Sequence, residues 1–210
     1  MQKESPAKIK IKKAALKLFN NENTLTITTN HIAKACKISP GNLYYHYKNK
    51  EEIITAIYLD MSIEFESYNS FEQILTSENP LQVLNTMYDK FGELFLKYKF
   101  LVRDIGALLP IYPSLKSEFL LRQNKRLGQI EGLLKYFIKI GIVTIEENEI
   151  QIRAKLNWFI SSYWQLFTAT SAETTDTSLK EVKTIVFDIL IKPILTPKGQ
   201  KLFKELDHTI

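Results

Sequence analysis

The sequence predicts an all-α fold, with a small N-terminal bundle of three helices and a larger C-terminal helical region. Three observations lead to this prediction. Apolar residues recur at three- and four-residue intervals along nearly the whole 210-residue chain, which is the period of an amphipathic helix. A capping residue followed by proline, a strong local helix start, occurs at Ser39-Pro40, Asn79-Pro80 and Thr196-Pro197. Seven glycines and seven prolines leave little room for low-complexity linkers.

Composition restricts the class of protein. The single cysteine, Cys36, excludes an intramolecular disulfide and a cysteine zinc cluster, so we interpret it as a small apolar filler. No apolar run approaches the roughly 18 residues of a membrane-spanning helix. Met1 is followed at once by polar residues rather than by a signal peptide. We therefore expect a cytoplasmic protein that makes no use of a membrane.

Charge is unevenly distributed along the chain. Residues 1–50 contain ten lysines against two glutamates, a net charge of +8, whereas the other 160 residues carry a net charge of −3. A basic segment on a mildly acidic body is typical of a protein whose one end meets a polyanion. A solvated lysine face is the simpler alternative, so the charge alone does not predict binding to a polyanion and a second observation is needed.

That second signal lies in residues 28–50. Thr28 and Thr29 can cap a short helix, and the Ser39-Pro40 pair begins another whose first turn is small and exposed. Two short helices joined by a tight turn, the second with a first turn able to enter a major groove, indicate a helix-turn-helix motif. The motif makes nucleic acid the favoured polyanion.

The other elements follow from apolar spacing and cap signals. Asn49 with Glu52 forms a variant capping box, and Thr144 with Glu147 forms another that opens a helix continuing through 167. Gly141 ends the long helix before it as a left-handed cap. The remaining helices are expected over about 7–22, 50–68, 80–97, 100–109, 113–140, 179–191 and 197–206, with 69–79 as a loop holding at most a short helical turn.

Two of the expected helices are apolar on nearly every side, over residues 156–167 and 179–191. Such helices need cover on both faces, and a chain of this size has few spare elements to provide it. We therefore expect a homodimer that packs the helices near 146–170 and 178–192 against their symmetry mates. The alternative is that both helices lie centrally in a monomer.

Residues 15–50, ALKLFNNENTLTITTNHIAKACKISPGNLYYHYKNK, resemble the DNA-binding domain of the tetracycline-repressor (TetR) family, and LYYHYKNKEEI is the most specific part. A weaker likeness continues in LVRDIGALLPIYPSLKSEF and LTPKGQKLF. The family usually has glycine where Asn23 and Lys37 stand here. The resemblance implies a helix-turn-helix DNA-binding domain over residues 1–50 and a helical effector-binding and dimerisation domain over 51–210.

The resemblance also implies which residues meet DNA. The phosphate candidates are Thr28, Tyr44, His46, Lys48 and Lys50. The base-edge candidates are Asn30, Pro40, Gly41, Asn42 and Tyr45, and the helix-start residues Thr29 and Ser39 complete the set. Asn42 can pair bidentately with adenine. The structural alternatives are a surface histidine at position 46 and core packing of one of the two adjacent tyrosines.

In this family the helical body carries a small-molecule site whose occupation changes the spacing of two DNA-binding heads. The candidate lining residues are Phe91, Phe95, Tyr98, Arg103, Phe119, Arg122, Phe137, Trp158, Ser161 and Tyr163. Their aromatic character favours a hydrophobic or amphipathic effector. A buried Arg103 needs a partner. We expect Asp104 in that role, and the carboxylate of an anionic ligand is the alternative.

The sequence therefore predicts a transcriptional regulator, in the form of a dimeric repressor that a ligand releases from a near-palindromic DNA operator. The alternative is an all-helical protein that binds lipophilic molecules without specific DNA binding. An enzyme is not expected, because the three histidines are scattered and the sequence has neither a His-x-x-x-His pair nor a glycine-rich phosphate loop. No cofactor and no metal are expected.

Overall fold

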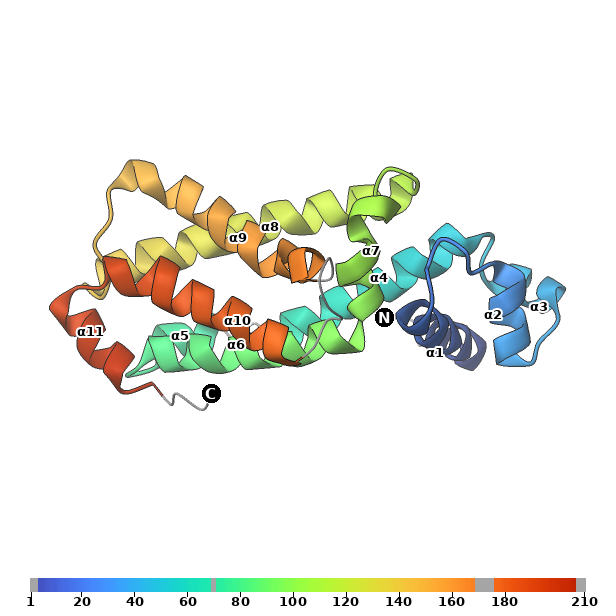
Figure 1. Ribbon diagram of the computed structural model, residues 1–210, viewed down its shortest axis with the longest axis horizontal. Helices are drawn as coiled ribbons and strands as arrows, with labels where there is room; N and C mark the ends of the chain where they lie inside the picture. Colours follow the sequence, from blue (N-terminus) through green and yellow to red (C-terminus); the bar gives the residue numbers. More distant parts are fainter. Residues whose placement is uncertain (1–3, 69–70, 169–175, 207–210) are drawn as a thin grey trace. The chain divides into compact units, whose positions relative to one another are not determined.

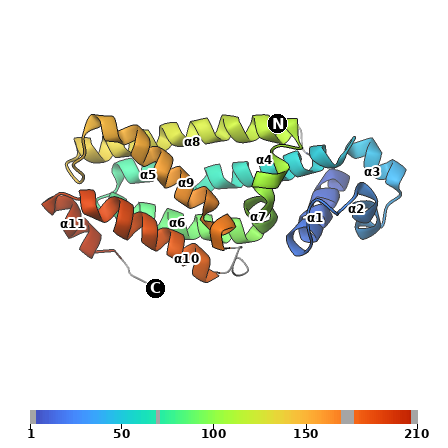
Figure 2. The same ribbon diagram turned by 45° about the horizontal axis from the view of Figure 1, so that its top comes forward.

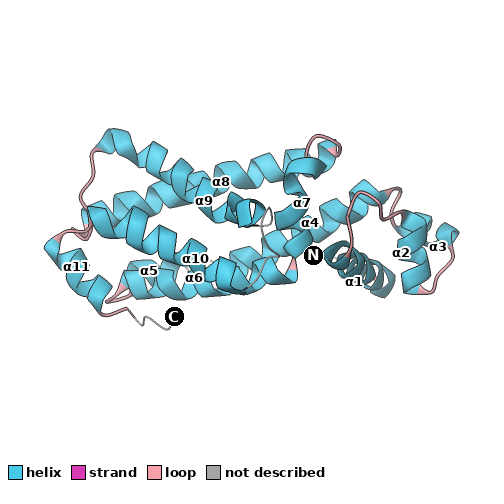
Figure 3. Cartoon of the chain, viewed as in Figure 1, coloured by secondary structure: helices cyan, strands magenta, loops and turns pink. Residues whose placement is uncertain are grey.

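The computed structural model describes residues 4–68, 71–168 and 176–206, and over these residues the regular secondary structure is helical (Figures 1 and 3). The all-α prediction is confirmed. The one β-bridge among the described residues pairs Val143 with Leu195 in antiparallel fashion. No helix within the described ranges is long and apolar enough to cross a membrane.

Except for α9, which begins later than predicted, the helices begin and end close to the residues that the sequence predicts. Their bounds are α1 Pro6–Asn21, α2 Thr29–Cys36, α3 Pro40–His46, α4 Lys50–Tyr68, α5 Phe71–Thr76, α6 Pro80–Lys97, α7 Lys99–Leu108, α8 Pro113–Lys139, α9 Ile150–Thr168, α10 Asp176–Thr184 and α11 Pro197–Lys204. A π-helical stretch, Ile185–Ile191, continues α10, and short 3-10 helices occupy Glu147–Glu149 and Lys192–Ile194. The predicted loop 69–79 holds the two-turn helix α5, and residues 69 and 70 lie outside the described ranges.

The chain divides into two compact units. The first comprises residues 1–63 with 98–120, and the second comprises 64–97 with 121–210. Helices α4 and α8 each contribute to both units. The first unit therefore contains α7 in addition to the predicted DNA-binding residues, while the functional division at residue 50 stays a prediction.

The core of the first unit joins α1, α2, α3 and α7. Phe19 of α1 and Phe100 of α7 are fully buried, with ring centroids 5.0 Å apart. Ile32 of α2 and Leu43 of α3 are equally buried, and each such side chain contributes about 1.5–3 kcal/mol of hydrophobic stabilisation. Cys36 is buried among them, and burial raises the pKa of its thiol, as the filler interpretation requires. Helices α1, α2 and α3 thus pack together with α7 around one core.

The core of the second unit lies between α6, α10 and α11, which run close together in Figures 1 and 2. Leu81, Met87, Val186 and Phe187 are buried members of this cluster. A short backbone ladder closes the unit, because Thr144 N donates to the Ile194 carbonyl at 2.8 Å. The ladder continues where Thr196 N donates to the Ile142 carbonyl at 3.1 Å.

Two capping predictions need correction. Thr144 does not open a helix, because its amide is committed to this ladder, and α9 begins only at Ile150 after the 3-10 helix. At the start of α4, Asn49 Oδ1 accepts from Glu52 N at 2.9 Å as predicted. The Glu52 carboxylate, however, accepts from Lys48 N at 2.8 Å, one residue before the expected amide.

Candidate nucleic-acid interface

The start of α2 is held by a reciprocal cap, in which Thr28 caps the helix as predicted and His31 supplies the half that the sequence analysis missed. Thr28 Oγ1 accepts from His31 N, and His31 Nδ1 accepts from Thr28 N, both at 3.3 Å. Histidine here takes the place that glutamate or glutamine usually fills in a capping box. Asn30 lies exposed between the two capping residues. The cap orders the first turn of α2, where free backbone amides favour a phosphate.

The turn from α2 to α3 contains a left-handed lysine. Lys37 has φ 55° and ψ 48°, which makes it the one non-glycine residue with positive φ in the described chain. Its amide and that of Ile38 donate to the last carbonyls of α2, so the residue ends the helix in the way that glycine commonly does. Asn23, the other departure from the family pattern, is not left-handed; its side chain accepts from Leu25 N at 2.9 Å.

The first turn of α3 is exposed, as the sequence predicts. Ser39 Oγ accepts from Asn42 N at 3.2 Å and caps the helix, and Pro40, Gly41 and Asn42 all face solvent. A methyl group added at Gly41 would meet no atom within 4 Å, so the packing of this chain does not require glycine there. Glycine inside a helix costs about 0.5–1 kcal/mol relative to alanine. Because packing within the chain does not require small residues in this turn, the turn is suited to close approach by a binding partner.

Both tyrosines that follow lie at the surface. Tyr44 is 49% exposed and Tyr45 is 85% exposed, so the structural alternative in which one of them packs into the core is wrong. The Tyr44 hydroxyl lies 2.9 Å from Thr29 Oγ1, which links α3 to the start of α2. The Tyr45 ring stands edge-on to half-buried His46 at 5.1 Å. The buried positions of this helix and its cap are Leu43 and Tyr47.

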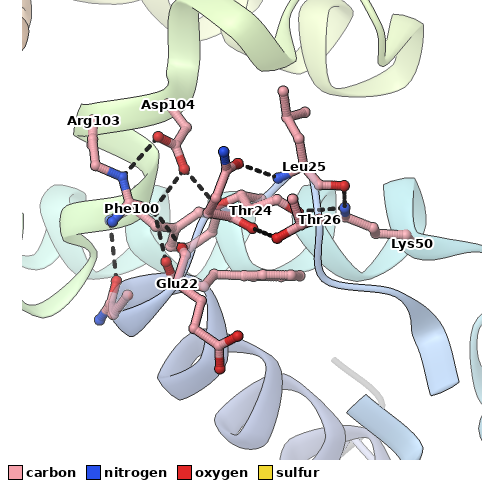
Figure 4. Close-up of polar contacts among 11 residues, drawn as sticks. Glu22, Thr24, Leu25, Thr26, Lys50, Phe100, Arg103 and Asp104 are labelled. Carbon is pink, nitrogen blue, oxygen red and sulfur yellow. Dashed lines mark hydrogen bonds and ion pairs between the residues drawn. The ribbon is translucent and has the colours of Figure 1, made fainter. Parts of the chain in front are cut away.

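Lys48 and Lys50 differ sharply in their surroundings. Lys48 is exposed, whereas the ammonium of Lys50 donates to the carbonyls of Thr24 and Leu25 at 2.5 and 3.2 Å (Figure 4). Burial lowers the pKa of Lys50. In this arrangement Lys50 fastens the loop between α1 and α2, and Lys48 is the lysine that presents its charge to solvent.

The positive field of the first unit comes from a subset of its lysines. Lys12 is buried and forms ion pairs with Glu4 at 2.8 Å and Asp60 at 2.5 Å, so its charge is compensated inside the unit. The exposed lysines of the described N-terminal region are Lys10, Lys13, Lys17, Lys34, Lys37 and Lys48. These are the charges available to attract a polyanion.

The predicted effector residues divide between the two units. Tyr98, Arg103 and Phe119 belong to the first unit, and the other seven belong to the second. Arg103 forms an ion pair with Asp104 at 2.7 Å, which is the partner that the sequence analysis favoured. Phe137 is a buried member of the second unit's core, and Tyr163 stacks on exposed Phe159 at 5.7 Å.

The second unit also contains aromatic and polar groups that the sequence analysis missed. The guanidinium of Arg126 lies 3.8 Å above the ring of Phe65, which stacks on Phe91 at 4.0 Å, while Arg126 pairs with Glu66 at 2.9 Å. Arg122, one turn earlier on α8, was the arginine chosen instead. The weak apolar pattern of α8 gives little indication of which arginine faces inward.

A polar cluster lies near this aromatic stack. The Tyr88 hydroxyl accepts from Asn157 Nδ2 at 3.1 Å and lies 3.4 Å from Ser161 Oγ. Burial raises the pKa of Tyr88, against a smaller lowering by these hydrogen bonds. Of these three residues, only Ser161 was among the candidate lining residues. A separate shallow apolar hollow of about 240 Å³ is lined by Leu75, Gln129, Gly132, Leu133 and Tyr136, none of which was a candidate.

Comparison with known proteins gives this architecture a family. Residues 11–57 match the family model described as "Bacterial regulatory proteins, tetR family". Residues 66–203 match the TetR model described as "Bacterial transcriptional repressor". The transcriptional regulator UidR of Escherichia coli K12 is 40% identical over 60 residues, which are 28% of this chain and 31% of UidR. The chain therefore aligns with about a third of that relative.

Solved structures agree with this result. A TetR-family regulator from Marinobacter aquaeolei VT8 superposes with a TM-score of 0.78 and 27% identity, covering 95% of this chain and 97% of the other. The complex of SmeT of Stenotrophomonas maltophilia with triclosan gives a TM-score of 0.64 with 16% identity, covering 93% and 94%, and shows the fold alone. The predicted resemblance is confirmed. Because the repressor family model matches more than half of its length and the tetR-family model matches its start, the chain belongs to the TetR family of bacterial transcriptional regulators.

Proposed function

We propose that this TetR-family regulator is a homodimeric repressor that reads a near-palindromic operator and is released from it by a hydrophobic or amphipathic small molecule. The observation that carries the DNA-binding part is the exposed first turn of α3. Its small residues, Pro40, Gly41 and Asn42, face solvent without an internal reason for glycine. Because operator binding takes place on the chromosome, the proposal also assigns the protein to the cytoplasm.

The proposed roles within the interface follow from exposure and chemistry. Asn42 can pair with adenine, and the rings of Pro40 and Tyr45 can contact a thymine methyl group. Lys48 and the amides at the start of α2 are suited to phosphates. Lys50 contributes by fastening the loop before α2, because its ammonium is engaged by Thr24 and Leu25.

An exposed apolar stripe on α9 supports the homodimer. Ile152, Leu156, Phe159 and Tyr163 follow one another at three- and four-residue spacing, and the first three are 43–63% exposed. On the neighbouring helix, Ile189 is also exposed. Contiguous apolar surface on a helix is typical of a protein–protein interface, and a two-fold partner would present the same stripe.

Side chains of the second unit support a hydrophobic or amphipathic effector. The Phe65–Phe91 stack provides aromatic surface, and Tyr88 with Asn157 and Ser161 provides hydrogen-bonding groups. A ligand that prefers the conformation unable to span both half-sites would release the operator. SmeT, which shares the fold, is known in complex with triclosan, an observation that belongs to that protein.

The DNA-binding proposal is tested by selecting duplexes from a random pool and measuring their affinity against salt concentration. Asn42→Ala should relax the sequence preference by about 1–3 kcal/mol at one position. Lys48→Ala should weaken binding to all duplexes and reduce the slope of log K against log salt by about one. The matched controls are Asn124→Ala and Lys135→Ala, which alter exposed residues of α8 in the second unit.

The same experiment separates the alternative function. An all-helical protein that only sequesters lipophilic molecules would enrich no sequence from the pool and would show no salt-dependent duplex binding. If the wild-type protein behaves in this way, or if Asn42→Ala and Lys48→Ala both bind like wild type, the operator assignment is wrong.

A further inference from the structure

Thr24 is a polar residue that side chains from two other parts of the first unit contact. It lies in the loop between α1 and α2 and is fully buried. Its hydroxyl donates to Asp104 Oδ2 at 2.6 Å, and its carbonyl accepts from the ammonium of Lys50 (Figure 4). Side chains from α7 and from the start of α4 therefore hold one loop residue from two directions.

Arg103 holds the same loop at its beginning. Its Nη2 donates to the carbonyls of Phe19 and Glu22, each at 2.9 Å, and so satisfies carbonyls at the end of α1 (Figure 4). Its Nε donates to Asp104 Oδ1 at 2.7 Å, which fixes the carboxylate that receives Thr24. The guanidinium is thus occupied by groups of its own unit, so an anionic ligand is not needed to explain it.

A second contact between α7 and α1 flanks this cluster. Phe100 N donates to Asn20 Oδ1 at 3.0 Å, and the Phe100 ring packs on Phe19. This hydrogen-bonded network is partly buried and contains the fully buried Thr24, and such networks select one arrangement of the elements that they join. The end of α1 and the loop after it therefore take their position from α7.

The loop leads directly to the DNA-binding residues. Three residues separate Thr24 from Thr28, the cap of α2, and one of them, Ile27, is buried. From there the Thr29–Tyr44 contact reaches α3. A displacement of Thr24 would therefore reach the amides at the start of α2 and, through the Thr29–Tyr44 contact, α3.

We propose that Arg103, Asp104 and Thr24 are positioning residues for operator binding, through which α7 sets the placement of α2 and α3. This inference rests on the proposed DNA-binding function and adds to it residues outside the helix-turn-helix motif. All three act through the loop between α1 and α2, and the candidate DNA contacts are other residues.

The decisive variant is Thr24→Val, which removes the hydroxyl while keeping the shape and the charge of the protein. The measurement is the affinity for the duplex that the wild-type protein enriches, by fluorescence anisotropy at several salt concentrations. We expect binding to weaken about 5- to 10-fold, as for other mutations that alter coupling between sites. The salt slope should stay unchanged, because no phosphate-binding charge is lost. Thr24→Ser, which restores the hydroxyl, should bind within about two-fold of wild type.

Hydrogen exchange separates positioning from a general loss of stability. In Thr24→Val the amides of residues 25–31 should exchange faster, while those of α6 and α10 keep their protection. Thr86→Val is the matched control, because the Thr86 hydroxyl bonds only within α6 as far as the described residues show, and this change should leave affinity and exchange unaltered. Asp104→Asn provides a second variant: it retains an oxygen for Thr24, weakens the pairing with Arg103, and should give a loss of the same sign.

Three results would overturn the inference. The first is that Thr24→Val binds the duplex as tightly as wild type. The second is that the loss of affinity in Thr24→Val equals the fraction of unfolded protein. The third is that Asp104→Asn leaves both affinity and hydrogen exchange unchanged. Each of these leaves the operator-binding proposal standing, provided that the wild-type protein enriches a duplex. If the wild-type protein enriches none, the proposed function and the positioning inference fail together.

Discussion

Lys37 shows how one residue can hold a conformation that its side chain disfavours. Its φ of 55° lies in the left-handed region, where a residue with a Cβ atom is less stable than glycine. The conformation persists because the amides of Lys37 and Ile38 close the end of α2. The turn of the helix-turn-helix motif is therefore built at some expense of stability.

Replacing Lys37 by glycine should stabilise the protein. We expect the free energy of unfolding to rise by about 1 kcal/mol, because glycine adopts this conformation without steric conflict. Lys34→Gly is the matched control, since it makes the same exchange at an exposed position inside α2 and should lower stability by about 1 kcal/mol. Urea denaturation of both variants measures the difference. Equal effects of the two substitutions would contradict the strain at Lys37.

Tyr88 makes stability depend on alkaline pH. Burial raises the pKa of its hydroxyl, so the folded protein keeps this proton at pH values where the unfolded chain loses it. The stability that neutral Tyr88 contributes is complete below the unfolded pKa of about 10 and declines as the pH rises above it, at up to about 1.4 kcal/mol per pH unit.

The test compares wild type with Tyr88→Phe in urea between pH 8 and pH 11. The wild type should be more stable at pH 8, and its advantage should shrink as the pH passes about 10. Neutral Asn157 and Ser161 are the hydrogen-bonding partners of the hydroxyl, so the difference between the two proteins isolates the tyrosine. A difference that stays constant to pH 11 would show that Tyr88 ionises alike in both states.

At the scale of elements, Gly199 allows α11 to close the second unit. A Cβ atom at this position would overlap the carbonyl oxygen of Ile142, which belongs to the ladder with Thr196. Backbone atoms in a ladder cannot move aside as the end of a flexible side chain can. The close approach therefore requires glycine.

Gly199→Ala should destabilise the protein by about 2–3 kcal/mol, the range of overpacked sites. Gly128→Ala on α8 is the control, because a methyl group there meets no atom within 4 Å and alanine favours the helix by up to about 1 kcal/mol. Thermal unfolding of the two variants should therefore shift in opposite directions. A neutral Gly199→Ala would mean that α11 docks differently.

These elements show what the sequence could and could not predict. Three helix starts were predicted from a pair of adjacent residues alone, and all three helices begin there: Ser39-Pro40, Asn79-Pro80 and Thr196-Pro197. The capping prediction at Thr144 was wrong because the competing carbonyl, that of Ile194, lies fifty residues further along the chain. Local patterns determine local structure, and long-range partners override them.

The same division applies to the candidate site. The exposed turn of α3 was predictable, because small residues behind a cap-proline pair define it. Asp104 was predictable as the partner of Arg103, being its neighbour in sequence. The carbonyls of Phe19 and Glu22 were not, since 84 and 81 residues separate them from Arg103. Sequence reasoning therefore assigned Arg103 to the effector residues, whereas the structure places it against the loop before α2.

At the scale of the whole molecule, the stripe on α9 makes the oligomeric state a direct test. Phe159→Glu introduces a charge at a 60% exposed position, and burying that charge in a two-fold interface is strongly unfavourable. We expect the wild-type protein to be a dimer and the variant to be a folded monomer by size-exclusion chromatography with light scattering. Leu121→Glu, which alters an equally exposed apolar residue of α8, should remain dimeric. A monomeric wild type would refute the homodimer.

At Gly41, operator preference can change without a change in the stability of the fold. Since a larger side chain at this position meets nothing inside the chain, mutations there are free of the packing penalties that restrict core residues. A descendant of this regulator can thus explore new target sequences through position 41 while its folding remains intact. A substitution at position 41 needs no compensating change elsewhere in the protein. We therefore expect the operator sequence to change faster during evolution than the structure of α2 and α3.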